Sequence, residues 1–229
     1  MQKFITEFFN NFRIEQPEKG YRFSIDPFLL CFHVPPLEDQ TVLDIGSGCG
    51  IIPLILKFKN PSLKVIGVEI QKELAFFARM NIRNNSIKSD IRIICRDIRD
   101  IARKDLNRTI DVIITNPPYK KKNSGRLSPD MQKSIARHEI TINIKELILS
   151  CKKLLSPSGR LFIIFPAERV PELFREMGSN NIKPLVTRFI HTADNSSPRF
   201  AVVSAVNNGT CLPVTAPCVN ISPELEIME

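Results

Sequence analysis

Four consecutive residues, Asn116, Pro117, Pro118 and Tyr119, end an aliphatic run and could hold a planar amine. An exocyclic amine is a poor nucleophile because its lone pair is delocalised into the ring or amide that carries it. The amide oxygen of Asn116 can accept one of its hydrogens, and two successive prolines hold the Pro117 carbonyl in a set direction to accept the other. Both bonds favour a pyramidal nitrogen that can attack an electrophilic carbon. We therefore take these four residues as the candidate catalytic residues, with Tyr119 stacking on the substrate ring.

A second cluster lies at residues 44–50, which read DIGSGCG. Gly46, Gly48 and Gly50 permit a sharp turn and a close approach of a ligand to the backbone, and the amide groups that open the next helix face that ligand. The spacing differs from the dinucleotide pattern G-x-G-x-x-G. Asp44 before the loop would repel a pyrophosphate and suits the cationic amino acid end of a ligand instead.

Two more acids follow later apolar segments. Glu69 can accept both ribose hydroxyls of a nucleoside, and Asp97 can accept a hydrogen bond from an adenine amino group. Each acid taken alone could equally be a helix cap or a solvated residue. Together with the glycine loop they predict a nucleoside pocket at the carboxyl edge of a sheet. Ser47, Ile70 and Ile98 are expected to line the same pocket.

The elements that must position these residues follow from the hydrophobic pattern. Strands are predicted at 41–45, 64–69, 91–95, 111–115, 160–165, 184–190 and 200–206, and helices at 51–58, 72–83, 143–155 and 168–177. Strands apolar on both faces that alternate with helices predict an α/β fold with a seven-stranded, mostly parallel sheet and helices on both faces. The connection 191–199 is too short for a crossover, so the last strand should be antiparallel.

The chain of 229 residues suits one domain with a sizeable core. We expect residues 20–206 to form the catalytic core. Residues 1–19 are predicted as an N-terminal helical extension, because the phenylalanines of 4–12 fall on one helical face. Residues 207–229 are predicted as a weakly specified, proline-containing tail.

Composition restricts the partners and the compartment. The net charge of +8 and the isoelectric point near 9.3 favour a polyanion, so nucleic acid is the partner to test. Six cysteines without a C-x-x-C pair indicate neither a metal cage nor a disulfide framework, and Cys49 is expected to be a small spacer rather than a nucleophile. The apolar runs are too short for a membrane span, and we expect a cytoplasmic protein that binds no membrane.

Over residues 20–206 the chain resembles the class I S-adenosylmethionine-dependent methyltransferases, which have a Rossmann-like fold. The NPPY stretch resembles the motif of amino-group methyltransferases that act on adenine in DNA or RNA, on guanine in ribosomal RNA, or on the glutamine of release factors. Residues 16–30, 136–140 and 188–206 are further similar to the bacterial family that methylates adenine 37, just 3′ of the anticodon, in valine tRNA.

That resemblance implies a cofactor, a partner and two more site residues. The cofactor is S-adenosyl-L-methionine, the product is S-adenosyl-L-homocysteine, and no metal takes part. Arg22 and Asp26 should lie at the methionine end of the cofactor, with Asp26 near its ammonium group. The partner is tRNA, and we expect a monomer or a weak dimer.

Three alternatives stay open. A protein glutamine-N5 methyltransferase would accept a Gly-Gly-Gln peptide, although such enzymes typically carry an N-terminal helical domain, which we do not find here. An rRNA guanine-N2 methyltransferase shares the NPPY motif. A non-catalytic RNA-binding module could retain the cofactor pocket. DNA adenine enzymes usually carry a separate recognition region, and a base in an RNA loop is easier to extrude than a paired base.

The segment after Tyr119 is rich in basic residues, and we expect it to close over the tRNA loop and contact phosphates. These residues are Lys120, Lys121, Lys122, Arg126, Lys133 and Arg137. Replacing Lys120, Lys121 and Lys122 with alanine should flatten the dependence of log Kd on log salt, because each lost phosphate contact removes roughly 0.9 from the slope. Filter binding of tRNA over a salt series measures this slope, and an unchanged slope refutes the contact.

Overall fold

The computed structural model describes residues 4–9, 12–18, 24–35, 37–85, 90–118, 142–191, 197–209, 214–217 and 219–220. Within these residues, no helix is both long and apolar enough to cross a membrane. All that follows concerns this part of the chain.

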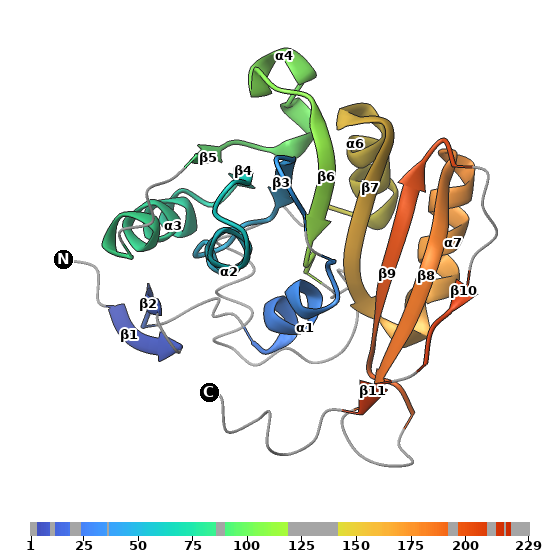
Figure 1. The fold of residues 1–229 in the computed structure, drawn as a ribbon, viewed down its shortest axis with the longest axis horizontal. Coiled ribbons are helices and arrows are strands. Elements are labelled where there is room, and N and C mark those ends of the chain that lie inside the picture. The colour runs from blue at the N-terminus through green and yellow to red at the C-terminus, as the bar shows by residue number, and fades with distance from the viewer. Residues whose placement is uncertain are drawn as a thin grey trace.

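A twisted central sheet carries the predicted strands (Figure 1). They are β3 (Thr41–Ile45), β4 (Lys64–Glu69), β5 (Ile91–Cys95), β6 (Ile110–Thr115), β7 (Leu155–Pro166), β8 (Ile182–His191) and β9 (Phe200–Asn207). Their order is β8-β9-β7-β6-β3-β4-β5, in which β9 runs antiparallel to both neighbours and the pairs from β7 to β5 are parallel. The predicted α/β class and the antiparallel last strand are confirmed.

The strand count differs from the prediction because the tail contributes to the sheet. The short strands β10 (Val214–Thr215) and β11 (Val219–Asn220) both pair in parallel with the outer edge of β8, so the sheet has nine strands. An unpaired edge leaves backbone donors and acceptors open to any extended segment that reaches it. The described parts of the tail therefore satisfy the edge of β8.

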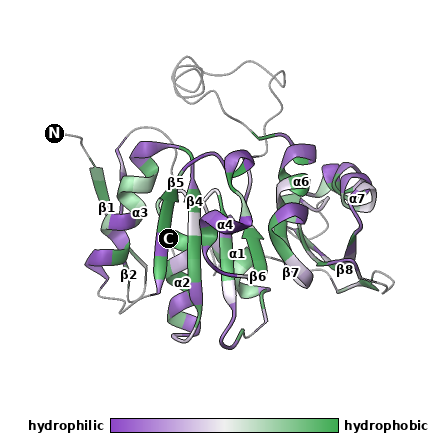
Figure 2. Ribbon diagram, turned by 90° about the horizontal axis from the view of Figure 1, so that it is seen from above, coloured by the Kyte–Doolittle hydropathy of each residue, from purple (hydrophilic) through white to green (hydrophobic). Residues whose placement is uncertain are grey.

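Helices cover both faces of the sheet. One face carries α1 (Asp26–Phe32), α2 (Ile51–Lys59) and α3 (Lys72–Asn84). The other carries α4 (Arg103–Leu106), α6 (Ile144–Leu154) and α7 (Val170–Ser179), with the 3-10 turns η1 (Ile98–Asp100) and η2 (Ala167–Arg169). Figure 2 shows hydrophobic residues along the central strands and hydrophilic segments in the helices around them. The pattern did not predict α1 or α4, which are too short to show a full helical period.

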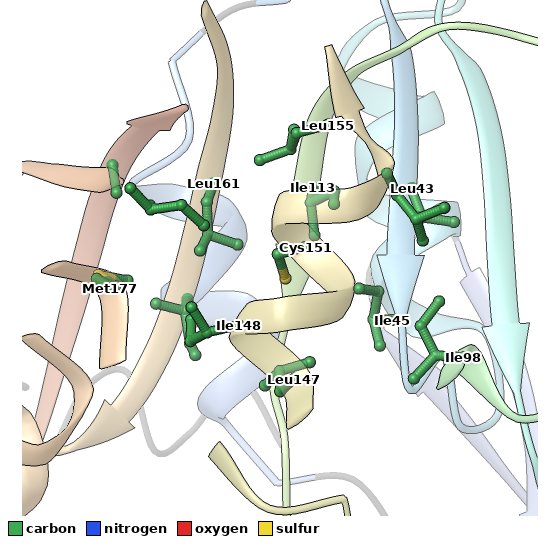
Figure 3. Close-up of a cluster of buried hydrophobic side chains, with 14 of the residues drawn as sticks. Leu43, Ile45, Ile98, Ile113, Leu147, Ile148, Cys151, Leu155, Leu161 and Met177 are labelled. Atoms are coloured by element: carbon green, nitrogen blue, oxygen red, sulfur yellow. The ribbon is translucent and has the colours of Figure 1, made fainter. Parts of the chain in front are cut away.

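Buried apolar side chains form one large cluster on each face of the sheet, and the larger cluster lies between the sheet and α6 (Figure 3). Leu147, Ile148 and Cys151 of this helix are buried against apolar side chains of β3 and β7, such as Leu43 and Leu161. The side chain of Asn143 caps the helix by accepting from the backbone N–H of Glu146 at 2.9 Å, and Glu146 accepts from the backbone N–H of Asn143 at 3.1 Å. The N-terminal cap and the buried contacts thus hold α6 against the sheet beside β6 and β7.

The N-terminal extension is a β-hairpin, and the prediction of a helical extension over residues 1–19 was wrong. Strands β1 (Phe4–Phe9) and β2 (Phe12–Pro17) pair antiparallel from Phe4 opposite Pro17 to Phe9 opposite Phe12. Phenylalanine, isoleucine and threonine favour strands, and this composition outweighs the helical spacing. Burial of Phe12 and Ile14 against the α1–α2 layer then selects the extended form.

Candidate functional site

The glycine loop between β3 and α2 has the conformation that its sequence predicts. Gly46, Gly48 and Gly50 adopt φ angles of 79°, 53° and 87°, in the left-handed region that other residues avoid. The backbone N–H of Gly46 donates to the carbonyl of Val68 at 2.8 Å, which fastens the loop to the end of β4. A Cβ on Gly50 would lie 3.1 Å from Ala78 of α3, so this glycine also allows α3 to approach closely.

A cavity of about 130 Å³ opens at the carboxyl ends of β3, β4 and β6. It brings together eight predicted residues: Gly46, Gly48, Glu69, Ile70, Asp97, Ile98, Asn116 and Pro118. A smaller cavity beside it is lined by Ser47 and again by Gly46, Gly48 and Asn116. Gln71, Leu74, Arg96 and Ile142 also line the larger cavity, and sequence analysis missed them. Gln71 and Arg96 adjoin predicted residues, which was the available signal, whereas Leu74 and Ile142 gave none.

Glu69 connects the loop to the next helix. Its Oε2 accepts a hydrogen bond from the backbone N–H of Gly48 at 2.9 Å, and its Oε1 accepts from the backbone N–H of Gln71 at 2.9 Å. Only 5% of the residue is exposed. These two bonds orient the carboxylate of Glu69 at the wall of the cavity.

Asp97 lines the cavity and also caps a turn. Its Oδ1 accepts from the backbone N–H of Arg99 at 2.9 Å, and its Oδ2 accepts from Nη2 of Arg99 at 2.6 Å. These hydrogen bonds from Arg99 lower the pKa of Asp97. Arg99 also contacts Glu146 of α6 at 3.3 Å, so the carboxylate of Asp97 is held in place through α6. Sequence analysis named the cap as an alternative for this acid but missed Arg99.

Asp44 lies beneath the loop and is completely buried. Neither oxygen of its carboxylate has a hydrogen-bond partner among the described residues. Burial raises the pKa of Asp44 to about 7, the nearby Ser47 hydroxyl opposes this increase, and the negative charge of Glu69 adds to it. A buried carboxylate without a partner is unfavourable, so this position calls for a proton or for a cationic group brought in by a ligand.

Asp44→Asn should therefore alter how stability depends on pH. In the folded state the pKa of Asp44 lies above its ordinary value of 3.8. The contribution of Asp44 to the free energy of unfolding is therefore complete below about pH 4 and is lost as the pH rises through about 7. Between pH 5 and pH 8 the wild type should lose roughly 2–3 kcal/mol of unfolding free energy relative to Asp44→Asn. Urea denaturation at the two pH values measures the difference. Asp100→Asn removes an exposed acid and serves as the control, and parallel curves for wild type and Asp44→Asn would contradict the assignment.

Asn116 lies where the two cavities meet. The hydroxyl of the preceding residue, Thr115, is buried and donates to the carbonyl of Ile45 at 2.9 Å, which clamps the end of β6 to the end of β3. Pro117 is buried and Pro118 is exposed at the rim. Asn116 thus follows a fixed strand end beside the glycine loop, and sequence analysis did not single out Thr115 as its support.

Asp26 and Cys49 flank the smaller cavity. Asp26 is the buried first residue of α1, and burial raises its pKa, while its neighbour Pro27 lines the cavity. Cys49 is buried in the glycine loop, and burial raises the pKa of its thiol to about 12. A thiol with so high a pKa supplies little thiolate at neutral pH, and the role of Cys49 as a small spacer stays a prediction.

Several predicted site residues lie outside the described residues. They are Arg22, Tyr119, Lys120, Lys121, Lys122, Arg126, Lys133 and Arg137. Their roles stay predictions. Within the described residues, no group of three or more His, Cys, Asp or Glu side chains is placed to hold a metal ion.

The sequence matches that of known proteins over most of its length. The methyltransferase small domain matches residues 26–172. The tRNA1(Val) (adenine(37)-N6)-methyltransferase of Porphyromonas gingivalis is 40% identical over 136 residues, which cover 58% of this chain and 52% of that protein. Proteins with the same name from Bacteroides fragilis and Tolumonas auensis are 28% and 31% identical, over 86% and 72% of this chain and 81% and 68% of theirs. The match to the Porphyromonas gingivalis protein thus spans about half of its length.

Solved structures share the fold at low sequence identity. A predicted O-methyltransferase, Atu636 from Agrobacterium tumefaciens, has a TM-score of 0.68 and 17% identity over 88% of this chain and 94% of its own. TrmN from Thermus thermophilus has a TM-score of 0.57 and 18% identity over 79% and 48%. Geranyl diphosphate C-methyltransferase from Streptomyces coelicolor, in complex with S-adenosyl-L-homocysteine, has a TM-score of 0.56 and 13% identity over 80% and 78%. These likenesses show a class I methyltransferase fold.

Proposed function

The chain belongs to the methyltransferase small domain family, and from this premise we propose that it methylates the exocyclic N6 of adenine 37 in valine tRNA, with S-adenosyl-L-methionine as the methyl donor. The curated relatives named above carry that activity in their names. The observation that carries the proposal is the position of Asn116 and Pro118 on the cavity that the glycine loop and Glu69 also line. The residues that we propose to accept hydrogen bonds from the amine would thus lie beside the proposed nucleoside pocket, at one edge of the sheet.

The residues around the cavity fit the proposed cofactor. Gly46 leaves open space where a side chain would stand, so a ligand can approach the backbone there. The buried carboxylates of Asp44 and Asp26 suit the ammonium of the methionine end, where Arg22 is also proposed to lie. Glu69 is placed to accept from the ribose hydroxyls, and Asp97 with Ile70 and Ile98 to surround the adenine. When bound, S-adenosyl-L-methionine supplies a methyl group on a positively charged sulfur.

The reaction that we propose needs little acid–base assistance. Asn116 and the carbonyl of Pro117 accept the two hydrogens of N6 and direct its lone pair, and Tyr119 stacks on the adenine. The nitrogen forms a bond to the methyl carbon as the carbon–sulfur bond breaks, and N6 then releases a proton to water. The proton becomes acidic only once the methyl group has arrived, so a strong base is not required. The contribution of the protein is to orient the amine and to stabilise the charge that develops on it.

The partner and the compartment follow from the substrate. A net charge of +8 favours association with tRNA, and the proposed contacts are Lys120, Lys121, Lys122, Arg126, Lys133 and Arg137. We place the protein in the cytoplasm, where bacterial tRNA is found. We propose a monomer or a weak dimer.

One assay separates this proposal from its rivals. Purified protein and labelled S-adenosyl-L-methionine are incubated with total tRNA from cells that lack the modification, and the product is digested to nucleosides. The expected product is N6-methyladenosine from valine tRNA. Parallel reactions contain a Gly-Gly-Gln peptide and unmodified ribosomal RNA. Label in the peptide or in guanosine would replace the proposal with a glutamine or guanine activity, and label in none of them would favour an RNA-binding module.

A further inference from the structure

Asn81 of α3 and Asn85, the residue that caps the C-terminus of α3, pair with the outer edge of β2 as a neighbouring strand would. The Nδ2 of Asn85 donates to the carbonyl of Arg13 at 2.7 Å, and its Oδ1 accepts from the backbone N–H of Arg13 at 2.8 Å. Asn81 repeats the pattern with Glu15, at 2.9 Å and 2.8 Å. The hairpin is therefore fastened to α3 by four amide hydrogen bonds, and α3 and β2 lie side by side in Figures 1 and 2.

The distance between Asn81 and Asn85 along the helix axis matches the distance between Arg13 and Glu15 along β2. Residues four apart on a helix are about 6 Å apart along its axis. Residues two apart on a strand are about 6.7 Å apart, and their N–H and C=O groups point to the same edge. Side-chain amides at positions 81 and 85 can thus pair with the backbone at 13 and 15. The hairpin gains a satisfied edge without a third strand.

Asn81 makes one contact that reaches further. Its Nδ2 also donates to the carbonyl of Cys49 at 2.9 Å, and the side chain is completely buried. Cys49 lies between Gly48 and Gly50, and the N–H of Gly48 donates to Glu69. One amide group therefore joins the hairpin, α3 and the glycine loop, and it uses both donors of its nitrogen to do so.

We propose that Asn81 is a positioning residue for the cofactor site, holding the glycine loop in its binding conformation and linking that conformation to the docked hairpin. The ligand named here rests on the proposed function. The loop residues between Asp44 and Ile51 have left-handed glycines, which are flexible unless they are held. Without the bond from Asn81, the Cys49 carbonyl would be buried and unpaired. The loop would also sample other conformations, and the entropy lost when a ligand orders it would weaken binding.

Asn85 provides a closely matched control. Its Oδ1 accepts from one backbone N–H of β2, and its Nδ2 donates to one carbonyl of β2 and to the carbonyl of Asn81, within its own helix. Asn81 makes the same number of bonds, but its third partner is the glycine loop. Changing each asparagine to aspartate removes two donations from each, and the variants differ in the loop contact and in burial, since Asn81 is completely buried and Asn85 is partly exposed.

The test is a calorimetric titration of the full chain with S-adenosyl-L-homocysteine, at a temperature where each variant is folded by circular dichroism. Asn81→Asp should weaken binding at least tenfold, and Asn85→Asp should stay within twofold of the wild type even though its melting temperature falls. Asn81→Ser and Asn85→Ser repeat the comparison without a buried charge, in case Asn81→Asp does not fold. A merely structural role would lower the melting temperature of both and leave the affinities equal.

Each outcome decides between the two ideas. Equal affinities for the Asn81 and Asn85 variants, beside normal binding by the wild type, would overturn the positioning role and leave the proposed function intact. A wild-type chain that does not bind S-adenosyl-L-homocysteine would overturn the proposed function, and the positioning role with it. A selective loss in the Asn81 variants supports both.

Discussion

Asn116→Ala should slow methyl transfer to tRNA about 10²–10³-fold while S-adenosyl-L-homocysteine still binds. The side chain lies at the junction of the two cavities, on a strand end that Thr115 clamps to β3. Truncation removes one of the two proposed acceptors of the amine. Removing one preorganised hydrogen-bonding group of this kind costs about 10²–10³-fold in kcat, because the bond strengthens as charge develops on the reacting atom.

The measurement needs both a rate and an affinity. Single-turnover transfer of labelled methyl groups to tRNA gives the chemical step, and calorimetry gives the affinity for S-adenosyl-L-homocysteine. Asn116→Asp retains one acceptor oxygen and should recover part of the rate. Asn180→Ala, which changes an asparagine at the far end of α7, should behave as the wild type. Wild-type turnover by Asn116→Ala would refute the assigned role of the amide, and equal loss of rate and cofactor binding would point to a collapsed site instead.

Glu69→Ala should produce the largest loss of cofactor affinity. The carboxylate accepts from Gly48 in the loop and from Gln71 at the start of α3, and it faces the cavity where the ribose is proposed to lie. Hydrogen bonds to a charged group contribute roughly 1.5–3 kcal/mol each, so the loss of two ribose contacts should weaken binding by at least about 100-fold. The loop, no longer fastened to β4 by this side chain, adds to the loss.

A conservative variant and a neighbouring acid make this result specific. Glu69→Gln keeps the shape and one acceptor oxygen, so its affinity should fall between those of the wild type and the alanine variant. Glu73→Ala changes an acid in the first turn of α3, outside the residues that line the cavity. This variant should bind S-adenosyl-L-homocysteine within a few-fold of the wild type. Wild-type affinity in Glu69→Ala would show that the ribose does not contact this carboxylate.

The N-terminal segment shows where local pattern was insufficient. Phenylalanines at 4, 8, 9 and 12 fit a helical face, and residues 4–17 nevertheless form a hairpin. The partners that decide this are Asn81 and Asn85, 66 and 72 residues away along the chain. Contacts between residues so far apart in the chain cannot be predicted from a local stretch of sequence, although these pair the backbone N–H and C=O of both Arg13 and Glu15.

The environments of Asp44, Glu69 and Asp97 could not be predicted from the sequence either. Their types and their positions after successive strands were enough to predict one pocket, because parallel strands bring their carboxyl ends to one edge. Their environments were not predictable. Asp44 is buried without a partner among the described residues, Glu69 holds two backbone amides, and Asp97 pairs with Arg99. Burial and pairing depend on what surrounds a side chain in three dimensions. The surroundings therefore decide the pKa of each acid and the hydrogen bonds that it makes.

The sequence alone was enough to predict the seven strands from β3 to β9, the main helices, the antiparallel last strand, the sharp turn of the glycine loop, and the sheet edge that Asn116 shares with the acids. Those features depend on periodicity and on residue type, which act over a few neighbours. The tertiary structure decided the hairpin, the pairing of the tail with β8, and the links from Asn81 and Thr115 that hold the site. Each of these joins segments distant in the chain, and its free energy exists only once the fold has brought them together.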